Sequence, residues 1–190
     1  MNNYSKVLDQ IVMTSRLQLQ QIDDEEMATK VKPEKWAKKE ILGHLIDSAY
    51  NNHHRLLRAE EQGNLIFLGY NQNEWVKKNA YQMREVSELI QTWAMANFHL
   101  ARLVAGIPTS QLESTSENHN FHIIGMNRPS AGSASSLGYL VWDYIAHLEH
   151  HLRQVISGYC SINPPFTGHE VIWLRIDLCE LPKCLNHISA

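Results

Sequence analysis

Helical periodicity over most of the chain is the feature that most limits its fold. Four long stretches, at about residues 4–22, 33–61, 85–106 and 133–158, place apolar side chains at three- and four-residue steps. That spacing lines one face of an α-helix, whereas a half-buried strand alternates apolar and polar residues. No segment of the sequence alternates convincingly in that way. The sequence therefore predicts an all-α protein in which four long helices pack as a bundle.

The segments between these stretches are predicted to be connectors of different kinds. Residues 23–32 begin with four acidic side chains and continue as a polar connector. Pro33 suits the first turn of a helix, so the second helix is expected to begin there. Residues 73–80 are expected to form a short helix, and residues 108–132, rich in Ser, Thr, Asn and Gly, a long loop. Loops of that length are usually functional or disordered.

The length of 190 residues fits one domain with a short additional element. We expect residues 1–160 to form the helical domain and residues 161–190 to be a C-terminal tail, whose role the sequence does not define. Within the tail, residues 171–178 suit either a strand or a docked helical turn.

Composition and charge exclude some partners and predict the compartment. A formal net charge of −3 and a pI of about 6.4 provide no basic field for nucleic acid or for an anionic membrane surface. The N-terminal residues lack an apolar signal segment, and the densest apolar run, residues 65–68, is far shorter than the about 20 residues that span a bilayer. Three cysteines, all near the C-terminus, suit a reducing compartment better than a disulfide-stapled secreted fold. We therefore expect a cytoplasmic protein.

Two histidines on the fourth stretch are the strongest candidates for a binding site. His147 and His151 are four residues apart, so both lie on one helix face within reach of a single ion. With eleven histidines in the chain, chance alone gives roughly 0.6 such pairs, so the spacing by itself carries little weight. The position is more informative, because apolar residues share this face while Glu149 and Arg153 point the opposite way. Imidazoles in an apolar core need partners, which favours a metal site.

A third metal ligand would have to come from another helix, as metal sites inside bundles generally require. His44 on the second helix is one candidate. It lies at the margin of the apolar face of that helix, where a solvated histidine is the simpler interpretation. His53 and His54 compete for the same role, although His53 fits an ordinary surface position. The spacing of the histidines alone therefore leaves the third ligand open.

Two stretches of the sequence resemble signatures of the DinB/YfiT-like family of metalloenzymes. The first is residues 35–48, Lys-Trp-Ala-Lys-Lys-Glu-Ile-Leu-Gly-His-Leu-Ile-Asp-Ser, on the second helix. The second is residues 138–155 on the last helix, which hold Gly-Tyr-Leu, then Asp143 and the run His-Leu-Glu-His-His-Leu-Arg-Gln-Val. Together with the helix order, the resemblance covers roughly residues 5–158. It implies an up-down-down-up four-helix bundle.

The resemblance also implies a metal centre and a class of activity. By position, it assigns the metal ligands to His44, His147 and His151, leaves His150 outside this ligand set, and makes zinc or nickel the expected ion. Several relatives use a low-molecular-weight thiol as cosubstrate, others are hydrolases, and homodimers are frequent. We therefore expect a metal-dependent S-transferase that acts on a small-molecule substrate with a low-molecular-weight thiol. The alternatives are a hydrolase that uses a metal-bound water and a non-catalytic, metal-stabilised binding module.

Other residues near these histidines have candidate supporting roles. Arg55 lies on the same side of its helix as His44 and could bind a substrate carboxylate, although a surface arginine is the simpler interpretation. Asp47 or Asp143 could orient a ligand imidazole from behind. A surface or capping role is the alternative for each carboxylate. His150 sits at the edge of the apolar face beside Asp143 and is a further candidate for this supporting layer.

Overall fold

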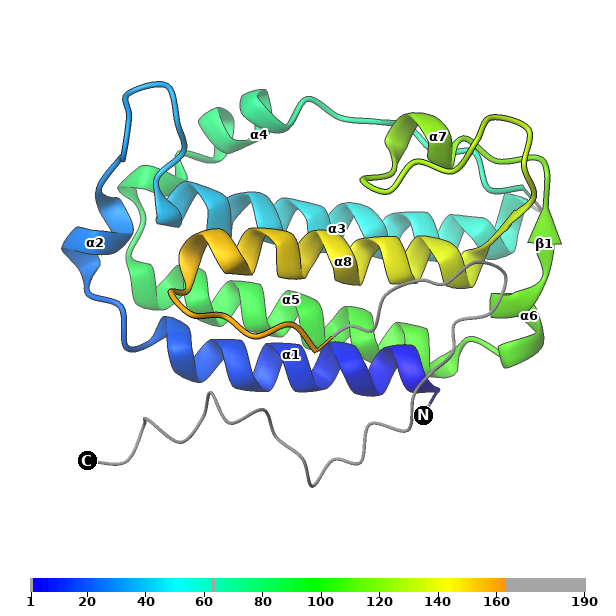
Figure 1. The fold of residues 1–190 in the computed structure, drawn as a ribbon, viewed down its shortest axis with the longest axis horizontal. Coiled ribbons are helices and arrows are strands. Elements are labelled where there is room, and N and C mark those ends of the chain that lie inside the picture. The colour runs from blue at the N-terminus through cyan, green and yellow to red at the C-terminus, as the bar shows by residue number, and fades with distance from the viewer. Residues whose placement is uncertain (1, 63, 163–190) are drawn as a thin grey trace.

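The computed structural model describes residues 2–62 and 64–162. The longest elements in this part of the chain are the helices α1 (Asn3–Leu19), α3 (Lys38–Gln62), α5 (Val86–Gly106) and α8 (Leu137–Val155). Figure 1 shows the four lying side by side, with α1 and α8 running in one direction and α3 and α5 in the other. The predicted up-down-down-up four-helix bundle is therefore confirmed.

Each long helix contacts two of the others. Helix α5 packs between α1 and α3, and α8 contacts both α1 and α3 from the other side. Apolar side chains from all four helices fill the interior, and Leu8, Leu45, Trp93 and Leu148 are completely buried. Complete burial of such a side chain contributes about 1.5–3 kcal/mol. The apolar core is therefore the main source of the stability of the bundle.

Short elements occupy the segments between the long helices. The short helix predicted at residues 73–80 is confirmed as α4. Residues 108–132 were predicted to be a loop, and this is wrong in part, because the segment contains α6, β1 and α7. Strand β1 pairs antiparallel with β2, the segment just before α8. The bounds are α2 (Asp24–Ala28), α4 (Gln72–Asn79), the 3₁₀ turn η1 (Tyr81–Met83), α6 (Thr109–Glu113), β1 (Thr115–Ser116), α7 (Phe121–Ile124) and β2 (Ser135–Ser136).

Helix α3 begins later than the sequence predicted. Pro33 lies in the connector before α3, whose first residue is Lys38. Glu40 fixes the start of the helix, because its Oε2 accepts a hydrogen bond from the backbone N–H of Ala37 at 2.8 Å. This bond satisfies an N–H group that the helix itself leaves unpaired. The ammonium group of Lys30 also lies 2.8 Å from the Glu40 carboxylate. The start of α3 is therefore set by Glu40 in its first turn and not by Pro33.

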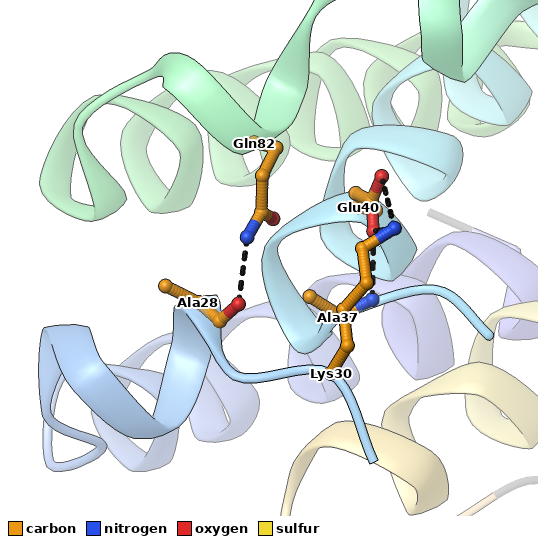
Figure 2. A network of polar contacts seen from close by, with 5 residues as sticks. All are labelled: Ala28, Lys30, Ala37, Glu40 and Gln82. Atoms are coloured by element: carbon orange, nitrogen blue, oxygen red, sulfur yellow. Dashed lines mark hydrogen bonds and ion pairs between the residues drawn. The ribbon is translucent and has the colours of Figure 1, made fainter. Parts of the chain in front are cut away.

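Figure 2 shows how the connector before α3 is held at both ends. At one end, the side-chain amide of Gln82 in η1 donates a hydrogen bond to the carbonyl oxygen of Ala28 at 2.6 Å. At the other end, the Glu40 carboxylate accepts a hydrogen bond from the backbone N–H of Ala37 and forms an ion pair with the ammonium group of Lys30. The turn η1 also lies directly against α3, where a Cβ atom on Gly43 would be only 2.1 Å from the Tyr81 ring. Only glycine at position 43 permits this approach.

Two connecting segments, the second of which includes α7, join above α3 and α8, and we call residues 65–72 and 118–128 the roof (Figure 1). The backbone N–H of Leu65 donates to the carbonyl oxygen of Asn118 at 3.0 Å. The Asn120 side chain accepts from the N–H of Phe67 at 3.0 Å and donates to the carbonyl oxygen of Phe67 at 2.7 Å. One asparagine therefore pairs with both backbone groups of Phe67, as a neighbouring strand would.

The chain after α8 covers a part of that helix that the sequence analysis placed away from the core. Glu149 is only 1% exposed. Its carboxylate accepts hydrogen bonds from the backbone N–H of Ile162 at 2.6 Å and from the hydroxyl groups of Ser161 at 2.5 Å and Tyr159 at 3.1 Å. Glu149 points away from the histidines but is buried, because residues 159–162 fold back over it.

None of the described helices is long and apolar enough to cross a membrane. The interpretation of residues 171–178, and that of the tail beyond its first two residues, falls outside the residues that the structure describes.

Candidate metal centre and its cavity

Three histidines from two helices meet in the interior of the bundle. His44 comes from α3, and His147 and His151 come from neighbouring turns of α8. Their candidate ligand atoms all lie within 4.8 Å of one another, and Nε2 of His44 is 3.0 Å from Nε2 of His147. The ring centroid of His151 is 4.9 Å from that of His44 and 4.6 Å from that of His147. This cluster could hold a metal ion.

The donor atoms of the cluster suit a divalent transition metal. Imidazole nitrogen is a common ligand of both zinc and nickel. Two nitrogens that are each about 2.1 Å from one ion lie about 3.4 Å from each other in tetrahedral geometry. The Nε2 atoms of His44 and His147 are 3.0 Å apart and form a hydrogen bond, so a small adjustment of the rings would let one ion contact both.

The electrostatics of the cluster keep its imidazoles neutral. His44 is completely buried, and this burial, with a smaller effect of His151, lowers its pKa to about 3. Burial also lowers the pKa of His147 well below the usual value, and the neighbouring histidines lower it further. The pKa of His151 is lowered chiefly by burial. Neutral imidazole is the form that binds a metal, so protons do not compete for these nitrogens at pH 7.

Two nitrogens of the cluster have unsatisfied hydrogen-bonding capacity. Nδ1 of His44 and Nδ1 of His147 are buried and have no hydrogen-bond partner among the described residues. Buried polar atoms are nearly always paired, and an unpaired one costs free energy. The hydrogen bond between the Nε2 atoms of His44 and His147 therefore compensates only part of the cost of burying these two rings.

A cavity of about 580 Å³ lies beside the cluster. Helices α3 and α8 form its floor and the roof segments form its upper wall. His147 and His151 line this cavity, whereas His44 is completely buried behind its surface. The volume is in the range of pockets that bind small molecules. The other lining residues are Ser48, Asn52, Arg55, Phe67, Leu68, Gly69, Tyr70, Gln72, Asn120, Ile123, Ile124, Gly125, Met126, Arg128, Leu140, Asp143, Tyr144 and His150.

Arg55 brings a buried positive charge to the cavity. Its side chain is only 8% exposed, so the alternative of a surface arginine is wrong. Nη1 donates to the side-chain oxygen of Asn52 at 3.4 Å, and Nη2 donates to the carbonyl oxygen of Leu68 at 3.3 Å. Among the described residues, no carboxylate lies within ion-pairing distance of this guanidinium. Burial lowers its pKa, but an arginine remains charged at neutral pH.

Comparison with known proteins gives the chain a family. A family model of the DinB superfamily matches residues 8–155. The chain belongs to the DinB superfamily.

A solved structure has the same fold as this DinB-superfamily chain. It is that of YfiT from Bacillus subtilis, described as a probable metal-dependent hydrolase with an unusual four-helix bundle topology. The two chains are 14% identical and superpose with a TM-score of 0.64 over 80% of this chain and 81% of YfiT. At this identity, the likeness establishes a shared fold. A comparison with curated proteins finds no match.

His44 is the residue of this DinB bundle whose environment the spacing misjudged. The periodicity of α3 placed it at the margin of the apolar face, yet it is completely buried. Helix α8 covers that side of α3, and the Trp36 ring, carried by the connector of Figure 2, lies 5.1 Å from the His44 ring between centroids. His53 and His54, the competing candidates, lie outside the cluster.

The two candidate carboxylates make their hydrogen bonds elsewhere in the chain. Oδ1 of Asp47 accepts from the hydroxyl of Tyr81 at 2.7 Å and from the side chain of Asn79 at 2.9 Å. Asp143 accepts from the backbone N–H groups of Met126 at 3.0 Å and Asn127 at 2.7 Å. The structure therefore places Asp47 at the contact of α3 with η1, and Asp143 beneath the roof.

Sequence reasoning missed one polar neighbour of the cluster, Gln154. Its Oε1 lies 3.2 Å from Nδ1 of His151, and its Nε2 lies 3.0 Å from Nε2 of His150. An Nδ1–H of His151 that donates to this amide oxygen leaves Nε2 of the same ring free for a metal. Gln154 follows His151 by three residues and His150 by four, so helical spacing contained the signal.

Proposed function

We propose that this protein is a divalent-metal-dependent enzyme whose ion is bound by His44, His147 and His151. The observation that carries the proposal is the position of the three imidazoles against a cavity of about 580 Å³. Within the described part of the chain, no fourth His, Cys, Asp or Glu joins the cluster. Catalytic zinc sites typically have three protein ligands and an open position, whereas structural sites have four. We propose zinc or nickel as the ion.

Some side chains around the cavity would bind the metal ion, and others would bind the substrate. When bound, a divalent ion supplies Lewis acidity, which lowers the pKa of a thiol or of water and so provides a nucleophile at neutral pH. The three imidazoles are neutral and leave the positive charge of the ion undiminished. Arg55 binds a negatively charged group of the substrate, and the roof separates the bound molecule from bulk water.

For the reaction, we propose S-transfer from a low-molecular-weight thiol to a small electrophile. The thiolate sulfur forms a new C–S bond, the leaving group departs with the electron pair of the bond that breaks, and the thiol proton passes to solvent. The volume of the cavity supports this proposal, because it suffices for a small thiol and an electrophile together.

Hydrolysis is the second candidate, and the specific observation in its favour is the likeness to YfiT, described as a probable metal-dependent hydrolase. In this case water takes the place of the thiol, and an acyl group or another electrophilic centre is transferred to it. The same imidazoles and the same cavity serve both reactions.

The proposal is tested with protein purified without a metal-affinity tag. Elemental analysis gives the metal content, and metal-loaded and metal-depleted samples are assayed with a panel of electrophiles and esters, with and without a low-molecular-weight thiol. We expect turnover that requires the metal and the thiol. Metal-dependent turnover without thiol would replace S-transfer by hydrolysis. Equal product formation by the metal-loaded and metal-depleted samples would overturn the enzyme proposal and favour a metal-stabilised binding module.

We also propose a cytoplasmic homodimer in which residues 1–160 form the catalytic domain and residues 161–190 an accessory tail. Sedimentation equilibrium of the full chain tests the dimer, and elemental analysis of a chain ending at residue 162 tests the division into domain and tail. A monomer at micromolar concentration would contradict the dimer, and loss of metal binding on truncation would contradict the division into domain and tail.

A further inference from the structure

The cavity holds a buried cation that forms no ion pair with a carboxylate among the described residues. Arg55 is only 8% exposed, and its hydrogen-bond acceptors are neutral. They are the oxygens of Asn52 and Leu68 at 3.3–3.4 Å and, with its amide in the orientation that satisfies both groups, the side-chain oxygen of Asn51 at 3.1–3.2 Å. A desolvated guanidinium with neutral partners alone is costly unless it binds an anion.

The other polar groups of the cavity do not pair directly with this cation. Asp143 lines the cavity, and its charge partly offsets the effect of burial, which lowers the pKa of Arg55. However, three donors of Met126 and Asn127 hold its carboxylate beneath the roof, and it forms no ion pair with the guanidinium. Tyr70 also lines the cavity, and burial raises its pKa to about 12, so it is a neutral hydroxyl at pH 7. The environment of Arg55 therefore offers a cation and hydrogen-bonding groups, which is the chemistry that recognises a carboxylate.

Three exposed apolar side chains line the same cavity, beside the exposed polar side chains of Gln72, Arg128 and His150. Leu68 is 85% exposed, Ile123 is 63% exposed and Met126 is 40% exposed, and all three side chains line the cavity. They come from both roof segments. Large apolar side chains that gather around a cavity commonly mark the position of an apolar part of a ligand.

We infer that the substrate is a small amphipathic carboxylate. Its carboxylate lies against Arg55, its apolar group lies against Leu68, Ile123 and Met126, and its reacting bond faces His147 and His151. Of the two arginines that line the cavity, Arg128 is exposed and only Arg55 is buried, and one buried guanidinium matches a singly charged anion better than a phosphate dianion. The inference rests on the proposed function, because it takes the cavity to be the substrate site of that enzyme.

The test compares three probes by isothermal titration calorimetry: hexanoate, its neutral amide hexanamide, and acetate. We expect the metal-loaded wild type to bind hexanoate at least about tenfold more tightly than either of the other two, because a hydrogen bond to a charged group and apolar burial both contribute. This comparison needs no variant. Equal affinities for hexanoate and hexanamide would overturn the inference that the substrate has a carboxylate. Equal affinities for hexanoate and acetate would overturn the inference that it has an apolar group. Tighter binding of phosphate than of hexanoate would overturn the inference as a whole.

Variants locate the two ends of the ligand. Arg55→Gln should weaken hexanoate binding about 10- to 100-fold, and Arg55→Lys should restore part of it. Arg58→Gln is the matched control, since Arg58 is an exposed arginine on the same helix and does not line the cavity. Leu68→Ser should weaken hexanoate binding roughly threefold and leave acetate unchanged. Circular dichroism and thermal melting establish that each variant is folded.

Metal content separates this inference from the proposed function. Hexanoate binding that survives metal removal and still depends on Arg55 supports the inference, even where elemental analysis finds no metal and the proposed function fails. Binding that disappears with the metal and is unaffected by Arg55→Gln would place the carboxylate on the ion and overturn the inference, while the metal-enzyme proposal would stand.

Discussion

Helix α8 buries polar side chains in two regions, and their hydrogen bonding differs. Towards α3 lie His147 and His151, with buried Nδ1 atoms on His44 and His147 that lack partners among the described residues. Away from them lies Glu149, whose carboxylate accepts hydrogen bonds from Tyr159, Ser161 and Ile162. Burial alone therefore does not identify a functional group. The Glu149 contacts attach residues 159–162 to the bundle and satisfy the buried carboxylate, whereas hydrogen bonds satisfy the buried histidine cluster only in part.

The largest effect is expected from removing a ligand. His147→Ala or His151→Ala should abolish metal binding and activity, since one ion needs all three imidazoles. The variants should stay helical and lose only about 1–3 kcal/mol of unfolding free energy, because the apolar core supplies most of the stability. Elemental analysis and circular dichroism check this. Wild-type metal content or turnover in either variant would refute the ligand assignment, and complete unfolding of both would favour a structural metal.

On the opposite region of α8, Glu149→Ala should lower the free energy of unfolding by about 2–3 kcal/mol, because hydrogen bonds from three donors are lost. Metal affinity should stay at the wild-type value. Glu149→Gln, which keeps one acceptor oxygen, should lose less. Urea unfolding and metal titration measure the two quantities on the same samples. A parallel loss of metal affinity in Glu149→Ala would show that the two regions are coupled and would remove the contrast between them.

Substitutions of Gln154 test whether its hydrogen bond with His151 orients that imidazole for metal binding. Gln154→Leu should reduce metal affinity about 10- to 100-fold, which is typical for the loss of a hydrogen bond that orients a ligand imidazole. Gln154→Glu keeps an acceptor for Nδ1–H of His151 and should retain most of the affinity. Competition with a chromogenic chelator provides the readout. Identical affinities for wild type and Gln154→Leu would leave Gln154 without a role in orienting His151.

A further effect concerns acidification of the metal-free protein. The pKa values of His44 and His147 are lowered in the folded state, so below pH 6.5 the unfolded chain binds more protons and unfolding is favoured. The free energy of unfolding is therefore highest above about pH 6.5. As the pH decreases below this value, it falls by up to about 1.4 kcal/mol per pH unit for each such imidazole. The metal affinity of the folded protein should stay near its neutral-pH value until well below pH 6.5, because protons compete with the metal only near the lowered pKa values of the ligands.

Urea unfolding at pH 7 and pH 5.5 measures this dependence. His44→Gln should reduce the acid sensitivity, whereas His54→Gln, which changes an exposed histidine outside the cluster, should not. Metal affinity of the folded protein that falls steeply between pH 7 and pH 6 would contradict ligation by imidazoles whose pKa values are lowered.

Local sequence signals predicted the long helices and the pair on α8, because both depend on residues three and four positions apart. The environments of His44 and Glu149 could not be predicted in this way. His44 is buried by a helix more than ninety positions further along the chain, and Glu149 is buried by a segment that follows the helix end. The later start of α3 depends on a competition between Pro33 and Glu40, which the contact with Ala37 decides. Packing between distant segments, rather than periodicity, set these outcomes.

Because α3 and α5 run in the same direction, the two segments that contribute to the roof differ in how far their lengths can change. Helix α3 has 25 residues and is therefore ~37 Å long. Because α5 starts beside the beginning of α3, residues 64–85 must travel back along that length (Figure 1), supplying Tyr70 to the cavity and Tyr81 to the contact with Gly43 on the way. Deletions in this return would pull one of these contacts apart. By contrast, α5 ends at the same end of the bundle where α8 begins, so residues 107–136 exceed the length that the connection needs. Changes of length during evolution, and engineered loop exchanges aimed at new substrates, should therefore be tolerated in the second segment and rejected in the first.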